Sequence, residues 1–575
     1  MKIGLSLLVS FIILFSILTL AILPTTSSAE YIGPKPQGTQ IGELPPNSEV
    51  TVGILIPPKN MNLLYLTAEE VANHQISSMS YKQVFSMFAQ PQLENKIKVF
   101  LQSKGFTISI SNPYVIVASA PSSVVENTFH TTLALFKENN ITYYKPTSTP
   151  TFPSFFSNVS ILGLTNYTSA DFQTNVYVLG KVENGKLIPQ TTTLQFSALM
   201  YSPQDIVGAY NITQDGRGVN VAIIDAYGDP TIYQDLQAFD SKFNLPPVNL
   251  TIVPIGPYHP IFGLDTGWDV ETALDVETVH GTAPYAHVIL VLTSSPSLIP
   301  AAIDYIVSED LANVTSMSFG IIENLIGATG FYYVFNGIPQ PNLPYWDYYF
   351  ALGTVEGISF FAASGDYGAY GETLTTYGGV SYPATSPFVT GVGGTSLFAN
   401  VTSGYLSSQN ASATYGYETA WSISDFLYFP FIGSDGGYST YYPKPPYQFM
   451  INGTTRPIPD VAADANPYTG LLTYVLGQEE VVGGTSLATP IWAGMAADII
   501  SVIHKPLGLF NDILYWIYEN QTLYNQVFHQ ITFGFNGLYS AHQGYNLVTG
   551  LGSVDWYNLM KAVEDYMSTP RLSIS

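Results

Sequence analysis

The chain has 575 residues, which is too many for one ordinary hydrophobic core and predicts two or more domains. Only 10% of the residues are charged, and 42 acidic residues against 18 Lys and Arg give a formal net charge of −24. This acidic balance argues against nucleic acid as a partner. The chain has no cysteine, so an exported form depends on its core and not on disulfides.

The same composition has a consequence in strong acid. Once the carboxyls are protonated, the 18 Lys and Arg with the eight His carry at most 26 positive charges, which is modest for a chain of this length. Little self-repulsion is then left to unfold the protein. Composition alone fits an acid-adapted protein and an ordinary acidic secreted protein equally well.

Residues 1–29 predict an export signal. Lys2 precedes an apolar run from about Leu5 to Leu23, and small residues follow up to Ala29. The run is also about long enough to span a bilayer, so an uncleaved membrane anchor is the alternative. We expect an extracellular, secreted protein, or one held at the cell surface.

Residues 30–190 predict a small α+β domain. Strand-like runs at 51–57 and 114–120 alternate with a helical stretch at 92–106. The stretch 144–156, YKPTSTPTFPSFF, is rich in Pro, Ser and Thr and predicts a linker within this N-terminal part.

Residues 196–575 predict a larger α/β domain. The near-continuous apolar runs at 219–228, 286–293 and 358–366 are typical of buried parallel strands. Such strands alternating with helices indicate a doubly wound sheet, in which active residues follow the carboxyl ends of the strands.

The segment 271–284, ETALDVETVHGTAP, contains two candidate catalytic bases. His280 begins an HGT string that resembles the histidine motif of subtilisins. The GTAPYA that follows it already resembles the strand entry found after the helix, so His280 is expected near the end of a helix. There we predict a surface or C-capping histidine.

Glu271 and Asp275 are the other candidate, since an i,i+4 spacing puts them on one helix face. Two like charges at this spacing raise one pKa and can share a proton. A histidine is protonated well below its pKa of about 6.5 and cannot accept a proton there, whereas a carboxylate with a pKa near 4 still can. The alternative for an isolated ExxxD pair is an ordinary solvated helix face.

The string GGTSLATP, at 483–490, predicts a nucleophile. A double glycine permits a tight turn, an apolar helix follows, and Ser486 is expected at the helix N-terminus, where free N–H groups favour an oxyanion. Pro490 is expected in the first turn, where its missing N–H costs little. An ordinary helix cap is the alternative for this string.

An ordered series of segments resembles the sedolisins, the serine-carboxyl peptidases. LDVE at 274–277, APYAHV at 283–288, SGDYG at 364–368 and PDVAADANPYTG at 459–470 match family segments in the right order. Residues 66–164 resemble the pro-kumamolisin-type propeptide. The resemblance implies a subtilisin-like, doubly wound, mostly parallel catalytic domain behind a small ferredoxin-like α+β prodomain.

The resemblance also implies site roles. Ser486 is the nucleophile, Glu271 its general base and Asp275 the residue that orients Glu271. Asp366 supplies an oxyanion-hole donor, which a carboxyl can do only when protonated. An extended substrate would bind along the main chain of Ser318 and Gly320.

Several positions depart from the family pattern. Phe319 stands where the family often has Trp, and Asp225 where it often has Glu, so the extended hydrogen-bond chain of some members is not expected here. A degenerate calcium site at Gln530, Ile531, Gly544 and Asn546 lacks both expected carboxylates. Because calcium affinity depends on ligand charge, we predict weak binding or none.

The function predicted on these grounds is a secreted, acid-active serine endopeptidase made as a self-processing zymogen, acting on proteins and peptides and binding its own propeptide. One alternative is a subtilisin-like protease using Asp225, His280 and Ser486. Another is an exported binding protein on an inactive protease fold.

Overall fold

The computed structural model describes residues 38–568 apart from a set of short internal segments. The segments left out are 139–140, 167–172, 175, 191–197, 265, 324–331, 336–337, 342–346, 371–378, 404–411 and 424–430. The predicted signal at 1–29 lies outside the described residues.

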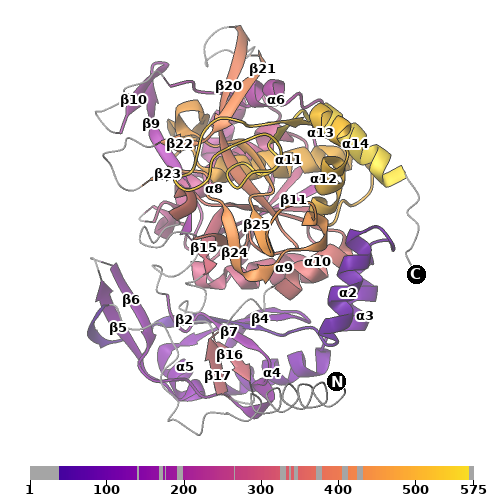
Figure 1. Ribbon diagram of the computed structural model, residues 1–575. Coiled ribbons are helices and arrows are strands. Elements are labelled where there is room, and N and C mark those ends of the chain that lie inside the picture. Colours follow the sequence, from indigo (N-terminus) through magenta and orange to yellow (C-terminus); the bar gives the residue numbers. More distant parts are fainter. Residues whose placement is uncertain are drawn as a thin grey trace, which may run out of the picture.

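The N-terminal part forms its own layer, the indigo to purple unit at the bottom of Figure 1. Its antiparallel sheet has the order β17-β16-β7-β2-β4-β3, and its central strands β2 and β4 are the two strand runs expected from the sequence. The bounds are β2 Glu49–Leu55, β3 Thr107–Ser111, β4 Val115–Pro121, β7 Ser160–Leu162, β16 Tyr332–Phe335 and β17 Ile338–Pro341. A second sheet has the order β1-β5-β6, with β1 Thr39–Glu43, β5 Leu133–Glu138 and β6 Ile141–Pro146.

Four helices complete this layer: α2 Met61–Ala72, α3 Tyr81–Phe88, α4 Pro91–Lys104 and α5 Ser122–Phe129. The α4 helix matches the helical stretch expected from the sequence. The linker prediction for 144–156 is wrong, because Phe152 and Phe156 are buried with Phe129 in the core of this unit. The prolines there set turns between packed aromatic side chains.

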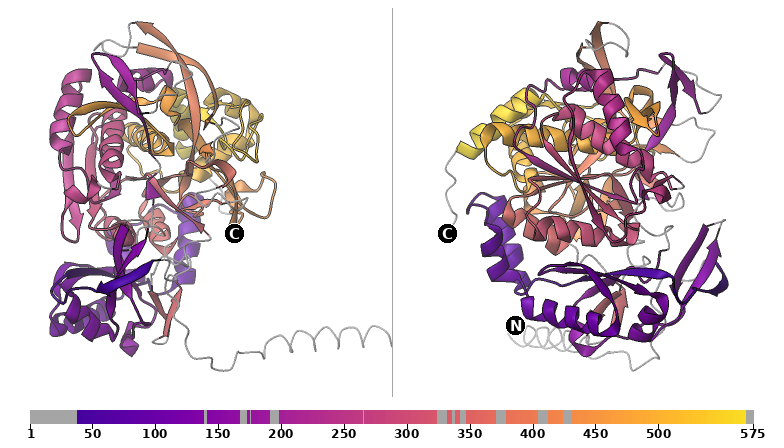
Figure 2. Two further views of the ribbon diagram at one scale, coloured as in Figure 1. Left: turned by 90° about the vertical axis from the view of Figure 1, so that its left-hand side faces the viewer. Right: turned by 180° about the vertical axis from the view of Figure 1, so that it is seen from behind.

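The C-terminal part, which the resemblance predicts to be a peptidase and which is called the peptidase part below, is built on a twisted, largely parallel sheet with helices on both faces (Figure 2). Its strand order is β12-β13-β11-β14-β18-β20-β21, with β26 beside β20 and only β21 antiparallel to its neighbour. The bounds are β11 Asn220–Ala226, β12 Asn249–Ile255, β13 His287–Thr293, β14 Val314–Met317, β18 Ser359–Ala363, β20 Thr390–Ser403, β21 Ser412–Ala420 and β26 Val461–Asp464. The predicted doubly wound α/β fold is confirmed.

Side-chain alternation along β11 decides which helices it contacts. Val221 and Ile223 belong to the core formed with α8 Trp268–Thr282 and α11 Thr485–Ile503. Ala222 and Ile224 belong to the core formed with α9 Ile299–Ser308 and α10 Asp347–Glu356. The period of two therefore puts Asp225 on the α8–α11 face of the sheet.

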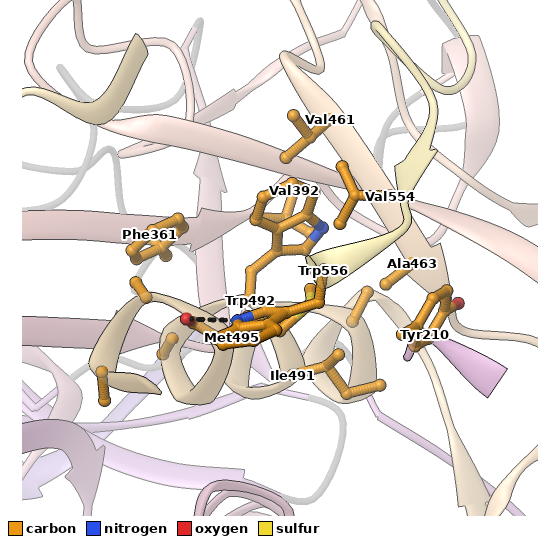
Figure 3. Close-up of a cluster of buried hydrophobic side chains, with 14 of the residues drawn as sticks. Tyr210, Phe361, Val392, Val461, Ala463, Ile491, Trp492, Met495, Val554 and Trp556 are labelled. Carbon is orange, nitrogen blue, oxygen red and sulfur yellow. Dashed lines mark hydrogen bonds between the residues drawn. The ribbon is translucent and has the colours of Figure 1, made fainter. Parts of the chain in front are cut away.

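The α11 helix is the centre of the large core. Trp492 packs against Phe361 of β18, and Trp556 of α14 Trp556–Ser568 donates through Nε1 to the Met495 carbonyl at 3.0 Å (Figure 3). Among the described helices, α11 is long and apolar enough to cross a membrane by length and composition, and most of its apolar stretch is buried inside the fold.

The two parts share one continuous core. The α9 and α10 helices lie between the parallel sheet and the N-terminal sheet, and α2 packs along α10. At Gly53 of β2, a Cβ atom would lie 3.2 Å from Leu298, which shows how closely the two layers approach. The β16–β17 hairpin of the peptidase part extends the N-terminal sheet, because Tyr332 and Tyr333 pair with β7.

Buried carboxyl groups are spread through the peptidase part. Burial raises the pKa of Asp225 and of Asp347 to about 7 and that of Asp229 to about 6. It also raises the pKa values of a further set of carboxyls: Glu277, Asp304, Glu356, Glu418, Asp464 and Asp498. Burial acts in the opposite sense on His529, lowering its pKa to about 4.

These shifts predict a protein that is more stable in acid. A carboxyl with a raised folded pKa keeps its proton in the native state, so its stabilising contribution is complete below an unfolded pKa of about 4 and is lost as pH rises through the folded value. The lowered pKa of His529 makes the folded state less stable in acid, but this is one group against the whole set of carboxyls with raised pKa values. For the Ser486→Ala chain, which cannot digest itself by the expected route, we expect a higher unfolding midpoint at about pH 4 than at about pH 7. A midpoint that rises steadily over that range in calorimetry would contradict this.

Candidate active site

Ser486 lies at the start of α11, directly after strand β28 Gln478–Gly483. Gly484 between them has a φ of 118°, a backbone conformation that favours glycine. Ser486 is fully buried, and its hydroxyl donates to the Ser318 carbonyl at 3.0 Å. The predicted position at a helix N-terminus is confirmed.

Glu271 and Asp275 lie one turn apart on α8, which packs against α11. Both side chains are fully buried, so this is not a solvated helix face. Burial, with the charges of Asp275 and Asp225, raises the pKa of Glu271 well above its usual range. Burial and the charge of Asp225 do the same to the pKa of Asp275.

No hydrogen bond of good geometry reaches either Glu271 oxygen within the described residues. The Ser486 hydroxyl is nevertheless close enough to lower the pKa of Glu271 against the larger effect of burial. Rotation of this hydroxyl away from the Ser318 carbonyl would direct its proton toward Glu271. The arrangement can therefore transfer a proton from the serine to a carboxylate.

Ser318 connects the two helices, a role that the sequence did not reveal. Its hydroxyl donates to Asp275 Oδ1 at 2.7 Å and lies 3.3 Å from the Ser486 carbonyl oxygen. Pro490 accounts for the second contact. It lies in the second turn of α11 and not in the first turn as predicted, and four residues after Ser486 it has no N–H to donate to that carbonyl. Ser318 Oγ lies at the place of the missing donor, and its single proton can be donated to this carbonyl or to Asp275 Oδ1.

Asp366 follows β18 and caps the active helix. Its Oδ1 accepts from the backbone nitrogen of Thr485 at 2.8 Å and from the Thr485 hydroxyl at 2.7 Å. The preceding Gly365 has a φ of 118°, and a Cβ there would lie 2.3 Å from Asp435. The charge of Asp366 raises the pKa of Glu271, so the two carboxyls share one site. Its donor role toward an oxyanion stays a prediction.

Asp225 completes a cluster of buried carboxyls. It is the second-last residue of β11, on the α8 face, and it is fully buried. The neighbouring Thr272 only partly offsets the effect of burial on the pKa of Asp225. Its charge contributes to the raised pKa values of both Glu271 and Asp275. Phe319 stands where the family often has Trp. Its ring packs on Trp268 and has no hydrogen-bonding group, so it cannot extend the hydrogen-bond chain of the site.

His280 lies in the last turn of a helix as predicted, but the surface role predicted for it is wrong. Its side chain is fully buried in the last turn of α8, and Nε2 lies 2.8 Å from Asp240 Oδ1 on α7 Ile232–Phe243. The end of α8 packs inside the core, so the imidazole ring contacts Asp240 of α7 and not solvent. The HGT string therefore places an imidazole in a structural pair with Asp240.

The chain's own segment runs past the candidate nucleophile. Strand β8 Gln173–Thr174 pairs antiparallel with β15 Phe319–Ile322, the edge predicted to bind substrate. Strand β9 Tyr177–Glu183 then pairs antiparallel with β28, which leads into Ser486. The register pairs are Gln173 with Gly320, Thr174 with Phe319 and Tyr177 with Gly483. An extended peptide is thus already held on both sides of the serine.

The residues at the predicted calcium position do not fit a cation. Asn546 is buried, its Oδ1 accepts from the backbone nitrogens of Val548 and Thr549 at 3.0 Å, and its amide nitrogen lies 3.3 Å from the His542 carbonyl. Gln530 Oε1 accepts from the backbone nitrogen of Gly544 at 3.0 Å.

The remaining contacts have the same character. The Gln530 amide nitrogen donates to Asn525, and the Asn546 amide nitrogen lies 3.5 Å from the Ile531 carbonyl. Side-chain donors therefore face the carbonyl oxygens that a metal ion would need. Among the described residues, no group of three or more His, Cys, Asp or Glu is arranged to hold a metal.

Comparison with known families divides the chain in two. Residues 36–167 match the family described as "Pro-kumamolisin, activation domain", and residues 266–526 match the subtilase family. The first match covers the N-terminal layer, and the second begins just ahead of α8 and includes Glu271, Asp275, Asp366 and Ser486.

Three bacterial relatives illustrate the similarity. Sedolisin of Pseudomonas sp. (strain 101) is 28% identical over 82% of this chain and 79% of its own length. Xanthomonalisin of Xanthomonas sp. (strain T-22) is 28% identical over 79% of this chain and 58% of its own length. Kumamolisin of Bacillus sp. (strain MN-32) is 30% identical over 63% of each chain. The chain thus spans less than two thirds of the latter two.

A solved structure is similar as well. Pseudomonas sedolisin, described as a serine-carboxyl proteinase complexed with two molecules of pseudo-iodotyrostatin, superposes with a TM-score of 0.56 at 28% identity. The match covers 64% of this chain and 99% of that one.

Proposed function

We propose that this chain, a member of the sedolisin family with an activation domain ahead of a subtilase-fold peptidase domain, hydrolyses peptide bonds in acid through Ser486, Glu271 and Asp275. The observation that carries the proposal is the buried constellation itself. Ser486 at a helix N-terminus lies beside a carboxyl pair on α8, and Ser318 ties the pair to the serine's own backbone.

The proposed chemistry is acyl transfer. Ser486 Oγ attacks the substrate carbonyl carbon while Glu271 takes the hydroxyl proton. The oxyanion is stabilised at the N-terminus of α11 and by a protonated Asp366. Glu271 then passes its proton to the departing amine, and water repeats the sequence to release the acyl group. Asp275, held by Ser318, keeps Glu271 in position.

Acid satisfies two requirements of this mechanism, a base that can still accept a proton and an oxyanion donor that is protonated. Mutually repelling carboxyls in a buried cluster share protons, so one member can be ionised and accept a proton while others stay protonated. An imidazole at the same position would be charged below a pKa of about 6.5 and unable to act as a base. The structural pairing of His280 with Asp240 disfavours the alternative in which His280 is the base.

The chain is proposed to be a zymogen that processes itself. The backbone pairing of β8 and β9 on either side of Ser486 presents the chain's own segment as a substrate would be presented. Cleavage in this segment, followed by removal of the N-terminal part, would free β15 and β28 for a substrate. We further propose that residues 1–29 direct export of the precursor, so that the acid enzyme works outside the cell.

The first prediction separates the two candidate bases. Glu271→Gln should lower kcat for peptide hydrolysis at about pH 4 by roughly 10²–10⁴-fold, the usual contribution of a general base. Asp275→Asn should lower it less, because Asp275 acts through Glu271. His280→Gln should retain activity within a few-fold in whatever fraction folds.

Glu277→Gln is the matched control, since Glu277 is a buried carboxyl of the same helix whose Oε2 accepts from the Tyr474 backbone nitrogen, away from Ser486. Steady-state kinetics with active-site titration measures all four variants. Full activity of Glu271→Gln with loss of activity in His280→Gln would refute the carboxylate mechanism.

The second prediction concerns calcium. We propose that the amide contacts of Asn546 replace a bound cation, so neither a chelator nor added calcium should move the unfolding midpoint of the wild-type chain. Asn546→Asp should lose about 1–3 kcal/mol without calcium, because it sets a carboxylate against the carbonyls of Ile531 and His542. Calcium should restore part of this loss.

Gln526→Glu, which adds a charge at an exposed position outside the predicted calcium site, is the control for charge alone. Thermal unfolding near pH 6, where the new Asp is ionised, provides the readout. A wild-type midpoint that drops on chelation would show that a metal is bound after all.

A further inference from the structure

The strand pairing shows in which direction the chain's own segment passes Ser486. It enters along β15, where Thr174 pairs with Phe319, next to the Ser318 carbonyl that accepts from Ser486. It leaves along β28, where Tyr177 pairs with Gly483, three residues before Ser486. If the stretch on β15 corresponds to the acyl side of a substrate, then Tyr177 lies on the side of the leaving amine.

The ring of Tyr177 is packed against a tryptophan. Its centroid lies 6.2 Å from that of Trp421 at an interplanar angle of 74°, the edge-to-face arrangement that aromatic pairs favour. Trp421 is fully buried although it lies close to this segment. Release of Tyr177 would therefore uncover part of the indole ring.

Trp421 is fixed before any peptide arrives. Its backbone nitrogen donates to the Gly394 carbonyl at 3.1 Å, and its carbonyl accepts from the Ser434 backbone nitrogen at 3.1 Å. Cβ atoms at two neighbouring glycines would also intrude here: at Gly394, 2.8 Å from the indole ring, and at Gly433, 2.7 Å from the Trp421 carbonyl oxygen. The glycines leave room for the indole, and the backbone contacts hold it, so the surface is preorganised.

The hydroxyl group of Tyr177 also contacts a residue of the site. Its hydroxyl shares a side-chain hydrogen bond with Tyr367, and burial together with the charge of Asp366 raises the pKa of Tyr177. Tyr367 follows Asp366 directly, and its backbone nitrogen donates to Asp435 at 2.6 Å. One face of the subsite is therefore apolar, and the other offers a hydroxyl partner.

We propose that Trp421 and Tyr367 form an aromatic subsite on the leaving-group side of Ser486, which Tyr177 fills in the precursor and an aromatic side chain of the substrate fills in the mature enzyme. This inference rests on the proposed peptidase function. It gives the enzyme a preference for Tyr, and to a lesser extent Phe, downstream of the bond that it cuts.

The test uses the chain's own sequence as substrate. Synthetic peptides spanning residues 170–182 carry Tyr, Phe or Ala at the position of Tyr177, and mass spectrometry identifies the bond cleaved. The enzyme is the acid-activated wild type, together with the Tyr177→Ala chain, whose own segment cannot fill the subsite. We expect kcat/KM to be at least about tenfold higher for Tyr than for Ala, with Phe between them.

Two enzyme variants sharpen the result. Trp421→Leu should bring kcat/KM for the Tyr and Phe peptides down to the value for the Ala peptide, and Tyr367→Phe should bring the Tyr peptide down to the Phe peptide. Tyr417→Leu is the control, because Tyr417 is an exposed aromatic residue of the adjoining strand β21 that stacks on Phe398. If Trp421→Leu does not fold, the peptide series on wild type still decides.

The outcomes separate the two proposals. Equal cleavage of the Tyr, Phe and Ala peptides would overturn the subsite and leave the peptidase function standing. No cleavage of any peptide, or of denatured protein, by the acid-treated chain would overturn the proposed function and the subsite with it.

Discussion

The site depends on one electrostatic constraint: the carboxyl groups of Asp225, Glu271 and Asp275 lie in a buried space, where the charge of Asp225 raises the pKa values of the other two. Among the described residues, the groups that shift these three pKa values are other carboxyls and hydroxyls. The contrast within the same fold is Asp460, whose buried carboxylate lies 2.7 Å from the guanidinium of Arg456. Protonation therefore neutralises the cluster, which is the condition that the proposed acid mechanism requires.

The fold delivers these groups through simple periodicities. The period of two along β11 directs Asp225 to the face covered by α8, and the i,i+4 spacing on α8 aligns Glu271 with Asp275. Pro490 lies inside α11 and has no N–H for the Ser486 carbonyl, and the Ser318 hydroxyl lies between that carbonyl and Asp275. One hydroxyl thus connects α11, which carries Ser486, with α8, which carries the carboxyl pair.

The sequence predicted the elements, and the residues that the fold brings together at the candidate site, better than their surroundings. Strong apolar runs and the turn before Ser486 are local signals, so β11, α8 and α11 could be identified. The role of the Ser318 hydroxyl, the pairing of His280 with Asp240 and the burial of Phe152 and Phe156 depend on residues distant in the chain. The pairing of β8 and β9 with the peptidase strands is also a long-range feature, and no local pattern encodes it.

The most direct measurement is the pH dependence of covalent modification of Ser486 by a peptide aldehyde or acylating probe, with Glu271→Gln as the comparison. The account predicts that Ser486 of the processed wild type reacts at about pH 4, and that Glu271→Gln reacts far more slowly under the same conditions. Modification that appears only as pH rises through about 6.5, the ordinary histidine pKa, and that persists in Glu271→Gln would contradict it.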